Sequence, residues 1–282
     1  MKMTAWYNGS FIDPDTAVIP IQERGHQFGD GIYEVIRVYS GMPFAMEDHL
    51  DRLEKSAAAV RLTLPMPREE LEALLLEALE RSGGEEAEIY LQITRGIHPR
   101  NHAFPKEDRP ALSIIVSPAR VLPEEEQENG IRVITTEDKR WTQCWIKSLN
   151  LLPNVLAKQE AVEQGAREAL LIRDGIVTEG SSTNVFLLRS GTLYTHPATE
   201  GILHGITRDR IIRAAAEADI PVVEETFTTD ALFDAEEVFI TSTTLEAAPV
   251  CEINGRTTGS SFPGTMKLRN LLQQQIRKEQ NQ

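Results

Sequence analysis

Trp145-Ile-Lys-Ser-Leu-Asn150 is an apolar run interrupted by a single amine, that of Lys147. Further along, Thr178-Glu-Gly-Ser-Ser-Thr-Asn184 places the carboxylate of Glu179 before a hydroxyl-rich turn and an apolar strand. Apolar neighbours lower the pKa of a lysine and free its amine for nucleophilic attack. Taken singly, each stretch also has an ordinary interpretation. The first could be a surface lysine at a strand edge, and the second a polar β-turn.

Length and composition describe an acidic globular protein. The chain has 282 residues and a net charge of −14, with 41% hydrophobic and 26% charged residues. This charge argues against a nucleic-acid or anionic-membrane surface, and no apolar stretch reaches the length of a membrane span. Two distant cysteines, Cys144 and Cys251, indicate neither a disulfide framework nor a zinc site, and they fit a reducing cytoplasm. We therefore expect a cytoplasmic protein without a metal.

Hydrophobic periodicity predicts an α/β (α+β) chain of two domains that meet at a cleft. A proline-containing segment with a carboxylate run, Ser117–Gln127, is the best linker candidate. The predicted domains are residues 1–120 and 128–282, joined by a linker at 121–127, and the second carries Lys147. Strands are expected at 34–39, 88–94, 111–116, 131–136, 169–172, 184–188 and 237–241, and helices at 48–60, 68–81, 155–164 and 207–218.

A sheltered lysine and a sheltered carboxylate are what a bound pyridoxal phosphate needs. Lys147 could form a Schiff base with the cofactor aldehyde, and Glu179 could pair with the ring nitrogen. Gly205-Ile-Thr-Arg208 opens a predicted helix whose free N–H groups could hold the phosphate, although a helix cap by Thr207 explains the same residues. The hydroxyls of Thr241-Ser-Thr-Thr244 and the charge of Arg52 could complete that site.

Two further segments could recognise a substrate. The loop Arg95-Gly-Ile-His-Pro-Arg-Asn-His102 could grip a carboxylate through charge-assisted hydrogen bonds, or it could be a basic surface loop. A glycine turn within Gln27–Glu34 could aim Tyr33 into a cleft, or Tyr33 could simply be packed.

Together these motifs resemble the fold type IV pyridoxal-phosphate aminotransferases, and most of all the D-amino acid aminotransferases among them. The resemblance covers essentially the whole chain. Its most specific parts are Arg24-Gly-His-Gln-Phe-Gly-Asp-Gly-Ile-Tyr-Glu34, Ile146-Lys-Ser-Leu-Asn150, Thr178-Glu-Gly-Ser-Ser-Thr-Asn184 and Gly205-Ile-Thr-Arg208.

The resemblance implies a role for each candidate residue. Lys147 is similar to the Schiff-base lysine that also moves the Cα proton, and Glu179 to the partner of the ring nitrogen. The resemblance also implies a homodimer and a cofactor in the interdomain cleft. The remaining implied roles are the phosphate cup (Arg52, Ile206, Thr207, Thr243), contacts with the ring (Ser182, Leu203) and the trap for the substrate α-carboxylate (Tyr33, Arg100, His102).

The expected reaction transfers the amino group of a D-amino acid such as D-alanine to 2-oxoglutarate, giving pyruvate and D-glutamate. The Cα–H bond must point at the lysine, so the position of the carboxylate trap decides which enantiomer reacts. Arg100 and His102 favour the D-enantiomer. Alternatives with the same fold are a branched-chain L-amino acid aminotransferase, an R-selective amine transaminase and an aminodeoxychorismate lyase. A non-catalytic acidic binding protein is a further alternative.

Overall fold

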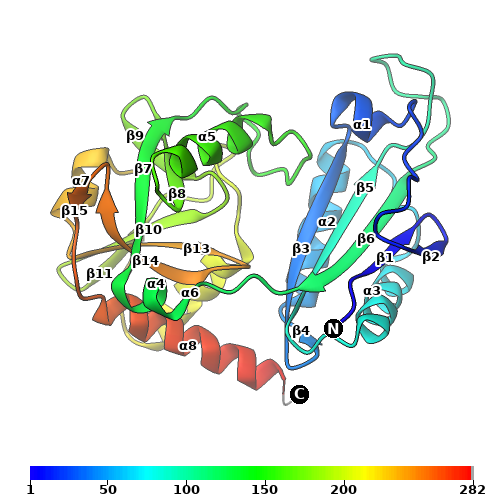
Figure 1. Cartoon of the computed structure of the whole chain (residues 1–282). Helices are drawn as coiled ribbons and strands as arrows, with labels where there is room; N and C mark the ends of the chain where they lie inside the picture. The colour runs from blue at the N-terminus through cyan, green and yellow to red at the C-terminus, as the bar shows by residue number, and fades with distance from the viewer. Residues whose placement is uncertain (281–282) are drawn as a thin grey trace. The chain divides into compact units, whose positions relative to one another are not determined.

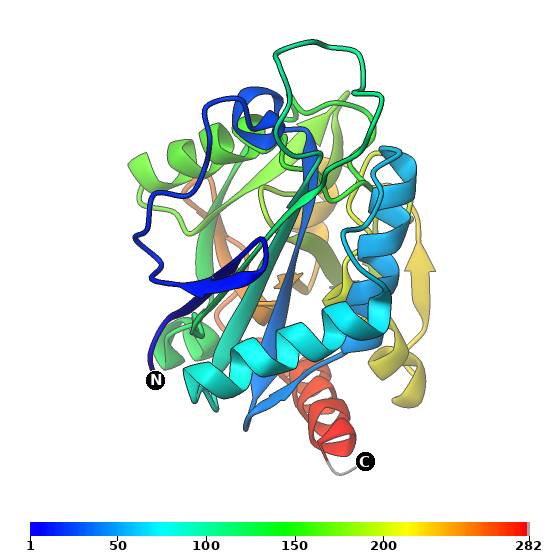
Figure 2. The same ribbon diagram turned by 90° about the vertical axis from the view of Figure 1, so that its right-hand side faces the viewer.

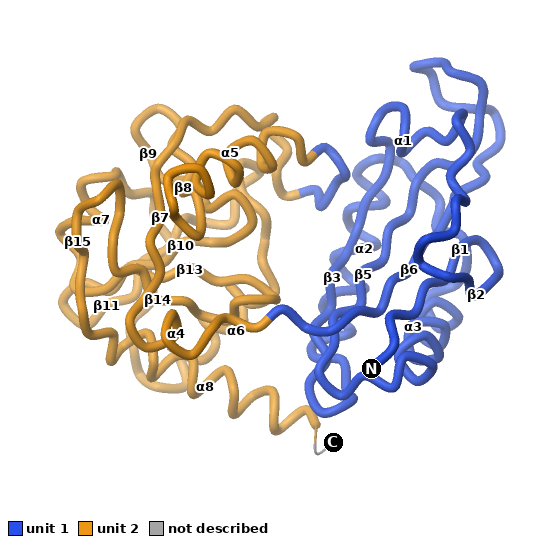
Figure 3. The backbone as a smooth tube through the Cα atoms, viewed as in Figure 1, with its two compact units in different colours: residues 1–120, 146–150 blue, residues 121–145, 151–282 orange. Residues whose placement is uncertain are grey.

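The computed structural model describes residues 1–280, which divide into two compact units (Figure 3). Unit 1 contains residues 1–120 and 146–150, and unit 2 contains residues 121–145 and the described residues from 151 onward. The chain therefore passes between the units at 120–121, at 145–146 and at 150–151. No helix within residues 1–280 is both long and apolar enough to cross a membrane.

Unit 1 is an antiparallel six-stranded sheet in the order β2-β1-β6-β5-β3-β4 (Figure 1). Two helices, α2 and α3, cover one face of this sheet (Figure 2) and bury a core of Ile, Leu and Val side chains. The elements are β1 (Thr4–Tyr7), β2 (Ser10–Ile12), α1 (Arg24–Phe28), β3 (Gly31–Tyr39), β4 (Met42–Pro43), α2 (Met46–Ala59), α3 (Arg68–Ser82), β5 (Ala87–Thr94) and β6 (Ala111–Pro118).

Unit 2 is built on a mixed nine-stranded sheet in the order β12-β11-β10-β13-β14-β7-β8-β9, with β15 paired to β14. Parallel pairing joins β7 to both β14 and β8. The elements are α4 (Glu124–Asn129), β7 (Ile131–Glu137), α5 (Leu152–Glu163), β8 (Glu168–Arg173), β9 (Ile176–Gly180), β10 (Asn184–Arg189), β11 (Thr192–Thr195), α6 (Ile206–Glu217), β12 (Val222–Glu224), α7 (Thr229–Asp234), β13 (Glu237–Ser242), β14 (Glu246–Ile253), β15 (Arg256–Thr257) and α8 (Pro263–Glu279).

The segment that carries Lys147 belongs to unit 1, whereas the sequence predicts it in the C-terminal domain. The reason is backbone pairing along the start of β3. Tyr33 N donates to Lys147 O at 3.0 Å, and Leu149 N donates to Gly31 O at 3.0 Å. Because β4 pairs only with the far end of β3, the edge at Gly31–Tyr33 accepts this segment as a short extra pairing.

One other prediction about local structure differs from what is observed. The carboxylate run predicted as part of the 121–127 linker instead begins helix α4, with Glu124, Glu125 and Glu126 in its first turn. Acidic side chains stabilise that end of a helix through its dipole. The predicted glycine turn before Tyr33 is preceded by the short helix α1, which ends at Gly29 in the left-handed conformation (φ 65°).

Candidate cofactor and substrate site

Unit 1 holds Lys147 against Tyr33. The Lys147 side chain is half-buried, and its Nζ lies 4.3 Å from the centre of the Tyr33 ring. Lys147 N donates to Ser56 Oγ on α2 at 3.2 Å, so the backbone on both sides of the lysine is fixed. The sequence predicts apolar shelter from five neighbours, Trp145, Ile146, Leu149, Leu151 and Leu152. Ile146 is buried, whereas Leu152 is 68% exposed. The immediate neighbour of the amine is therefore the face of a phenol ring.

Glu34 holds Arg52 in a fixed orientation from one side. Arg52 Nε donates to Glu34 Oε1 at 2.7 Å, and Arg52 Nη2 donates to Glu34 Oε2 at 2.8 Å. His49 Nδ1 hydrogen-bonds the same Oε2 at 2.8 Å. All three side chains are buried. This two-point contact fixes the plane of the guanidinium, as a site for a phosphate requires.

Charge and burial act in opposite directions on this group. Burial alone would raise the pKa of Glu34, but the Arg52 charge and the hydrogen bonds from Arg52 and His49 hold it well below its usual range. Burial lowers the pKa of His49, and the charges of Arg52 and Lys147 lower it further. His49 is therefore a neutral ring at neutral pH, and it feels both cations that the sequence assigns to cofactor binding.

Arg100 and His102 lie in an exposed loop of unit 1, beside α1. The Arg100 guanidinium carbon is 4.8 Å from the centre of the Phe28 ring, and the His102 ring is 5.4 Å from the same ring. Arg100 and His102 thus pack against the same ring.

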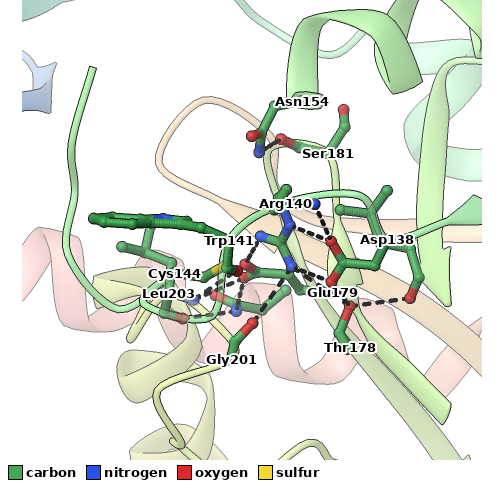
Figure 4. Close-up of polar contacts among 12 residues, drawn as sticks. Asp138, Arg140, Trp141, Cys144, Asn154, Thr178, Glu179, Ser181, Gly201 and Leu203 are labelled. Carbon is green, nitrogen blue, oxygen red and sulfur yellow. Dashed lines mark hydrogen bonds and ion pairs between the residues drawn. The ribbon is translucent and has the colours of Figure 1, made fainter. Parts of the chain in front are cut away.

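In unit 2, the Glu179 carboxylate is buried at the end of β9 and accepts hydrogen bonds from three residues (Figure 4). Arg140 Nη1 donates to Oε1, Asn184 Nδ2 donates to Oε2 at 3.0 Å, and Leu203 N lies 3.0 Å from Oε2. Asp138 in turn holds Arg140 through Nε at 2.9 Å and Nη2 at 2.8 Å. The carboxylate is therefore fixed before any ligand arrives.

Burial raises the pKa of Glu179 to about 7, against the lowering effects of the Arg140 charge and the Leu203 N–H. Burial also works to lower the pKa of Arg140, but the Asp138 hydrogen bond and the charges of Glu179 and Asp138 raise it overall. Arg140 therefore stays protonated, while Glu179 holds its proton more readily than an ordinary carboxyl group. A cation that approached Glu179 would favour its ionisation.

The N-terminus of α6 has the geometry of an anion site. Gly205 is its N-cap, and no side chain among residues 1–280 caps its first N–H groups, so the predicted alternative of a Thr207 cap is wrong. A Cβ at Gly205 would lie 2.2 Å from Asn184 Oδ1, so only glycine fits beside the amide that holds Glu179. Within the described residues, the buried Thr241 Oγ1 has no hydrogen-bond partner. The uncapped N–H groups at the start of α6 are hydrogen-bond donors that suit an oxyanion.

The remaining predicted residues of unit 2 lie on three different segments. Leu203 is half-buried and its backbone contacts Glu179, while Ile206 and Thr207 form the first turn of α6. Ser182 is exposed, and its Oγ donates to the buried Glu168 Oε2 at 2.9 Å. Thr243 is half-buried in the turn between β13 and β14.

Sequence analysis misses the residues that hold the candidate residues in place: Glu34, His49, Asp138, Arg140 and Asn184. Glu34 and Asn184 stand inside quoted motifs, where their position next to Tyr33 and after the hydroxyl-rich turn was a usable signal. Asp138 and Arg140 follow β7 with no distinguishing pattern. Their role becomes apparent only when β7 pairs with β8, which in turn pairs with β9.

The family model described as amino-transferase class IV matches residues 31–253. A D-alanine aminotransferase of Bacillus licheniformis is 44% identical over 279 residues, which is 98% of this chain and 98% of that protein. A D-alanine aminotransferase of Listeria monocytogenes is also 44% identical, over 97% of this chain and 96% of that protein.

Among solved structures, the branched-chain aminotransferase of Thermoproteus uzoniensis with norvaline superimposes with a TM-score of 0.88. It is 28% identical, and the match covers 100% of this chain and 97% of that one. The match spans both units, as does the match of the family model. The family model and the relatives of 44% identity both cover most of the sequence, so this chain belongs to the class IV aminotransferases.

Proposed function

We propose that the chain is a pyridoxal-phosphate-dependent D-amino acid aminotransferase. It would transfer the amino group of D-alanine to 2-oxoglutarate, giving pyruvate and D-glutamate in a ping-pong reaction. Full-length identity of 44% to D-alanine aminotransferases, against 28% to the branched-chain enzyme, supports the D-specific assignment. The observation that carries the chemistry is the buried carboxyl group of Glu179, which three donors fix in place and whose pKa burial raises.

The residues of each unit fit the cofactor by chemical type. Unit 2 would supply Glu179 for the ring nitrogen, Leu203 and Ser182 for the ring, and the uncapped N–H groups of Ile206 and Thr207, with Thr243, for the phosphate. Unit 1 would supply Lys147 for the aldehyde and Arg52 for the phosphate. When bound, pyridoxal phosphate supplies an electron sink for the charge left at Cα after proton loss.

The chain's own groups carry the remaining steps. Glu179 would keep a proton on the atom that it faces, because a buried carboxylate held by Arg140 gains by pairing with a cation. Lys147 would move the Cα proton, since its backbone is fixed on both sides while its amine can swing over Tyr33. Arg100 and His102 would bind the substrate carboxylate, and this placement would select the D-enantiomer.

One experiment tests the proposal directly. The purified yellow holoenzyme is mixed in turn with D-alanine, L-leucine and a simple R-amine, and the absorbance band of the bound cofactor is followed. We expect D-alanine to bleach the band and L-leucine to leave it. Bleaching by L-leucine but not by D-alanine would refute the D-specific assignment and favour a branched-chain enzyme. A colourless protein that takes up no added cofactor would favour a binding protein.

We further propose that the protein is a cytoplasmic homodimer. Helix α5 exposes a row of apolar side chains, Leu152, Val155, Leu156 and Val162, each more than half exposed in a single chain. A second copy that covers them would remove this apolar area from water. The free thiols of Cys144 and Cys251 suit a reducing compartment. Sedimentation at micromolar concentration tests the assembly, and a species of one chain's mass would contradict it.

A further inference from the structure

We propose that Phe28, at the end of helix α1, is a positioning residue that sets the carboxylate trap and thereby contributes to substrate specificity. This inference rests on the proposed role of Arg100 and His102. Both of those side chains are exposed, so their own burial does not fix them. What they share is one neighbour, the half-buried ring of Phe28.

The Phe28 ring contacts two of the three residues of the trap, Arg100 and His102. Arg100 lies over the ring with its guanidinium carbon 4.8 Å from the centre, and the His102 ring is tilted 50° to it at 5.4 Å. Guanidinium groups bind aromatic faces through charge and ring quadrupole without using their N–H donors. Within the described residues Arg100 has no carboxylate partner, so this contact orients its charge and leaves its donors for a ligand.

Arg24, on the same short helix, holds the residue between the two. Its Nη1 donates to Asn101 O at 2.5 Å, and its Nε donates to Asp30 Oδ2 at 2.7 Å. The Arg24 guanidinium carbon is also 4.9 Å from the centre of the Phe28 ring. Residues 100, 101 and 102 are thus each held by α1, two through Phe28 and one through Arg24.

Helix α1 is itself fixed to the strand that leads into the loop. Arg24 N donates to Gly96 O at 2.9 Å, and the Glu23 side chain both caps the helix at His26 N and accepts from Thr94 Oγ1. A Cβ at Gly25 would lie 2.4 Å from Thr94 Cγ2, so the helix lies directly against β5. A rigid support of this kind can hold exposed side chains in a productive geometry.

The test compares holoenzyme variants of two phenylalanines in unit 1. Phe28→Leu removes the ring beneath Arg100, whereas Phe11→Leu removes a ring beneath Arg81, 4.1 Å away, outside the loop. We expect Phe28→Leu to raise the KM for D-alanine about three- to tenfold with little change in kcat, because one ring contact at an exposed site is modest. Phe11→Leu should leave both constants unchanged. Phe28→Tyr, which keeps an aromatic ring, should have the wild-type KM.

A second measurement does not depend on turnover. Hydrogen exchange of the peptide that covers residues 97–104 should quicken in Phe28→Leu and in Arg24→Lys, which loses the bond to Asn101 O, but not in Phe11→Leu. If Phe28→Leu folds poorly, Phe28→Met keeps the apolar volume without the ring face and is expected to show the same rise in KM. Arg100→Ala sets the upper limit of the effect.

The outcomes separate this inference from the proposed function. A KM that rises in Arg100→Ala but stays at the wild-type value in Phe28→Leu and Phe28→Met would overturn the positioning role alone. A KM unchanged in Arg100→Ala as well would overturn the carboxylate trap, and the inference with it. Equal rises in KM in Phe28→Leu and Phe11→Leu would also overturn it, since the effect would then reflect general loosening of unit 1.

Discussion

Arg140 and Glu179 form a buried ion pair in which Arg140 is held by a second carboxylate, Asp138. Burial raises the pKa of Glu179 to about 7, and Arg140 opposes that rise. Another positive group that approached Glu179 would favour its ionised form. Arg140 therefore influences the pKa of Glu179 without any need to contact the substrate.

Replacing Arg140 by Met should raise the pKa of Glu179 above 7, because burial would then act without its main counterweight. Cofactor affinity at pH 7 should fall about tenfold, and the pH at which affinity is half-maximal should rise. Titrating the chain with pyridoxal phosphate between pH 6 and 9 measures both. Arg173→Met, which removes another cation beside Asp138, is the control, and an equal shift there would contradict the specific role.

Glu179 should also make the cofactor-free protein less stable as pH rises. Its folded pKa of about 7 lies above its ordinary value of 4.5, so its contribution is present below pH 4.5 and is lost as pH rises to 7. The change is about 3 kcal/mol in the free energy of unfolding. Urea unfolding of wild type and Glu179→Gln at several pH values measures it. A wild-type pH profile that matches the variant's would contradict the raised pKa.

Glu34 should act in the opposite sense. Arg52 holds its pKa below the usual range, so its stabilising contribution is present above pH 4.5 and is lost as pH falls. Glu34→Gln leaves Arg52 and His49 buried without their carboxylate, which should cost about 3–5 kcal/mol of unfolding free energy at pH 7. Glu107→Gln breaks an exposed pair with Arg109 and should cost below about 1 kcal/mol. Equal losses in urea unfolding would contradict the importance of the buried group.

Gly205→Ala should weaken cofactor binding at least tenfold. The new methyl group would meet Asn184 Oδ1 at 2.2 Å and displace the amide that donates to Glu179, so the carboxylate and the start of α6 would both move. Gly201→Ala is the matched control, because its nearest neighbour would be Thr199 Oγ1 at 3.6 Å. Cofactor dissociation constants from absorbance titration decide between them. Unchanged affinity in Gly205→Ala would remove this helix end from the phosphate site.

Lys147→Ala should abolish amino-group transfer. The variant should still bind pyridoxal phosphate through the phosphate contacts, but D-alanine should no longer produce pyruvate, because the group proposed to move the Cα proton is lost. Lys55→Ala, an exposed lysine on α2, should behave as wild type. Pyruvate release measured by a coupled assay tests this. Pyruvate formed by Lys147→Ala at the wild-type rate would remove the lysine from its assigned role.

Periodic segments were predictable from the sequence, because their side chains already mark a buried face. The predicted helix at 68–81 corresponds to α3 (Arg68–Ser82), and the predicted strand at 88–94 to β5 (Ala87–Thr94). The carboxylate run at Glu124 was wrongly predicted as linker because a short, exposed helix has no buried face to create a period. Composition alone cannot distinguish such a helix from a linker.

The candidate site divides in the same way. Lys147 and Glu179 were predicted from their combination with the other motifs, since each stretch taken singly also has an ordinary interpretation. Glu34, Arg140 and Asn184 act through contacts that span 18, 39 and 5 residues. The two longer contacts depend on which helix packs on β3 and on which strands lie between β7 and β9. The local sequence pattern does not indicate the order of strands in a sheet.

The short excursion of residues 146–150 into unit 1 has a consequence for splitting the gene. A cut at 120–121 would leave one fragment with Tyr33 and Ser56 but no reactive amine, and the other with the amine but none of the backbone partners that hold it. Neither half would be competent alone, and colour would return only upon reassembly. A cut at 120–121 would therefore make this chain a reporter of fragment association. The absorbance band of the bound cofactor would be the signal.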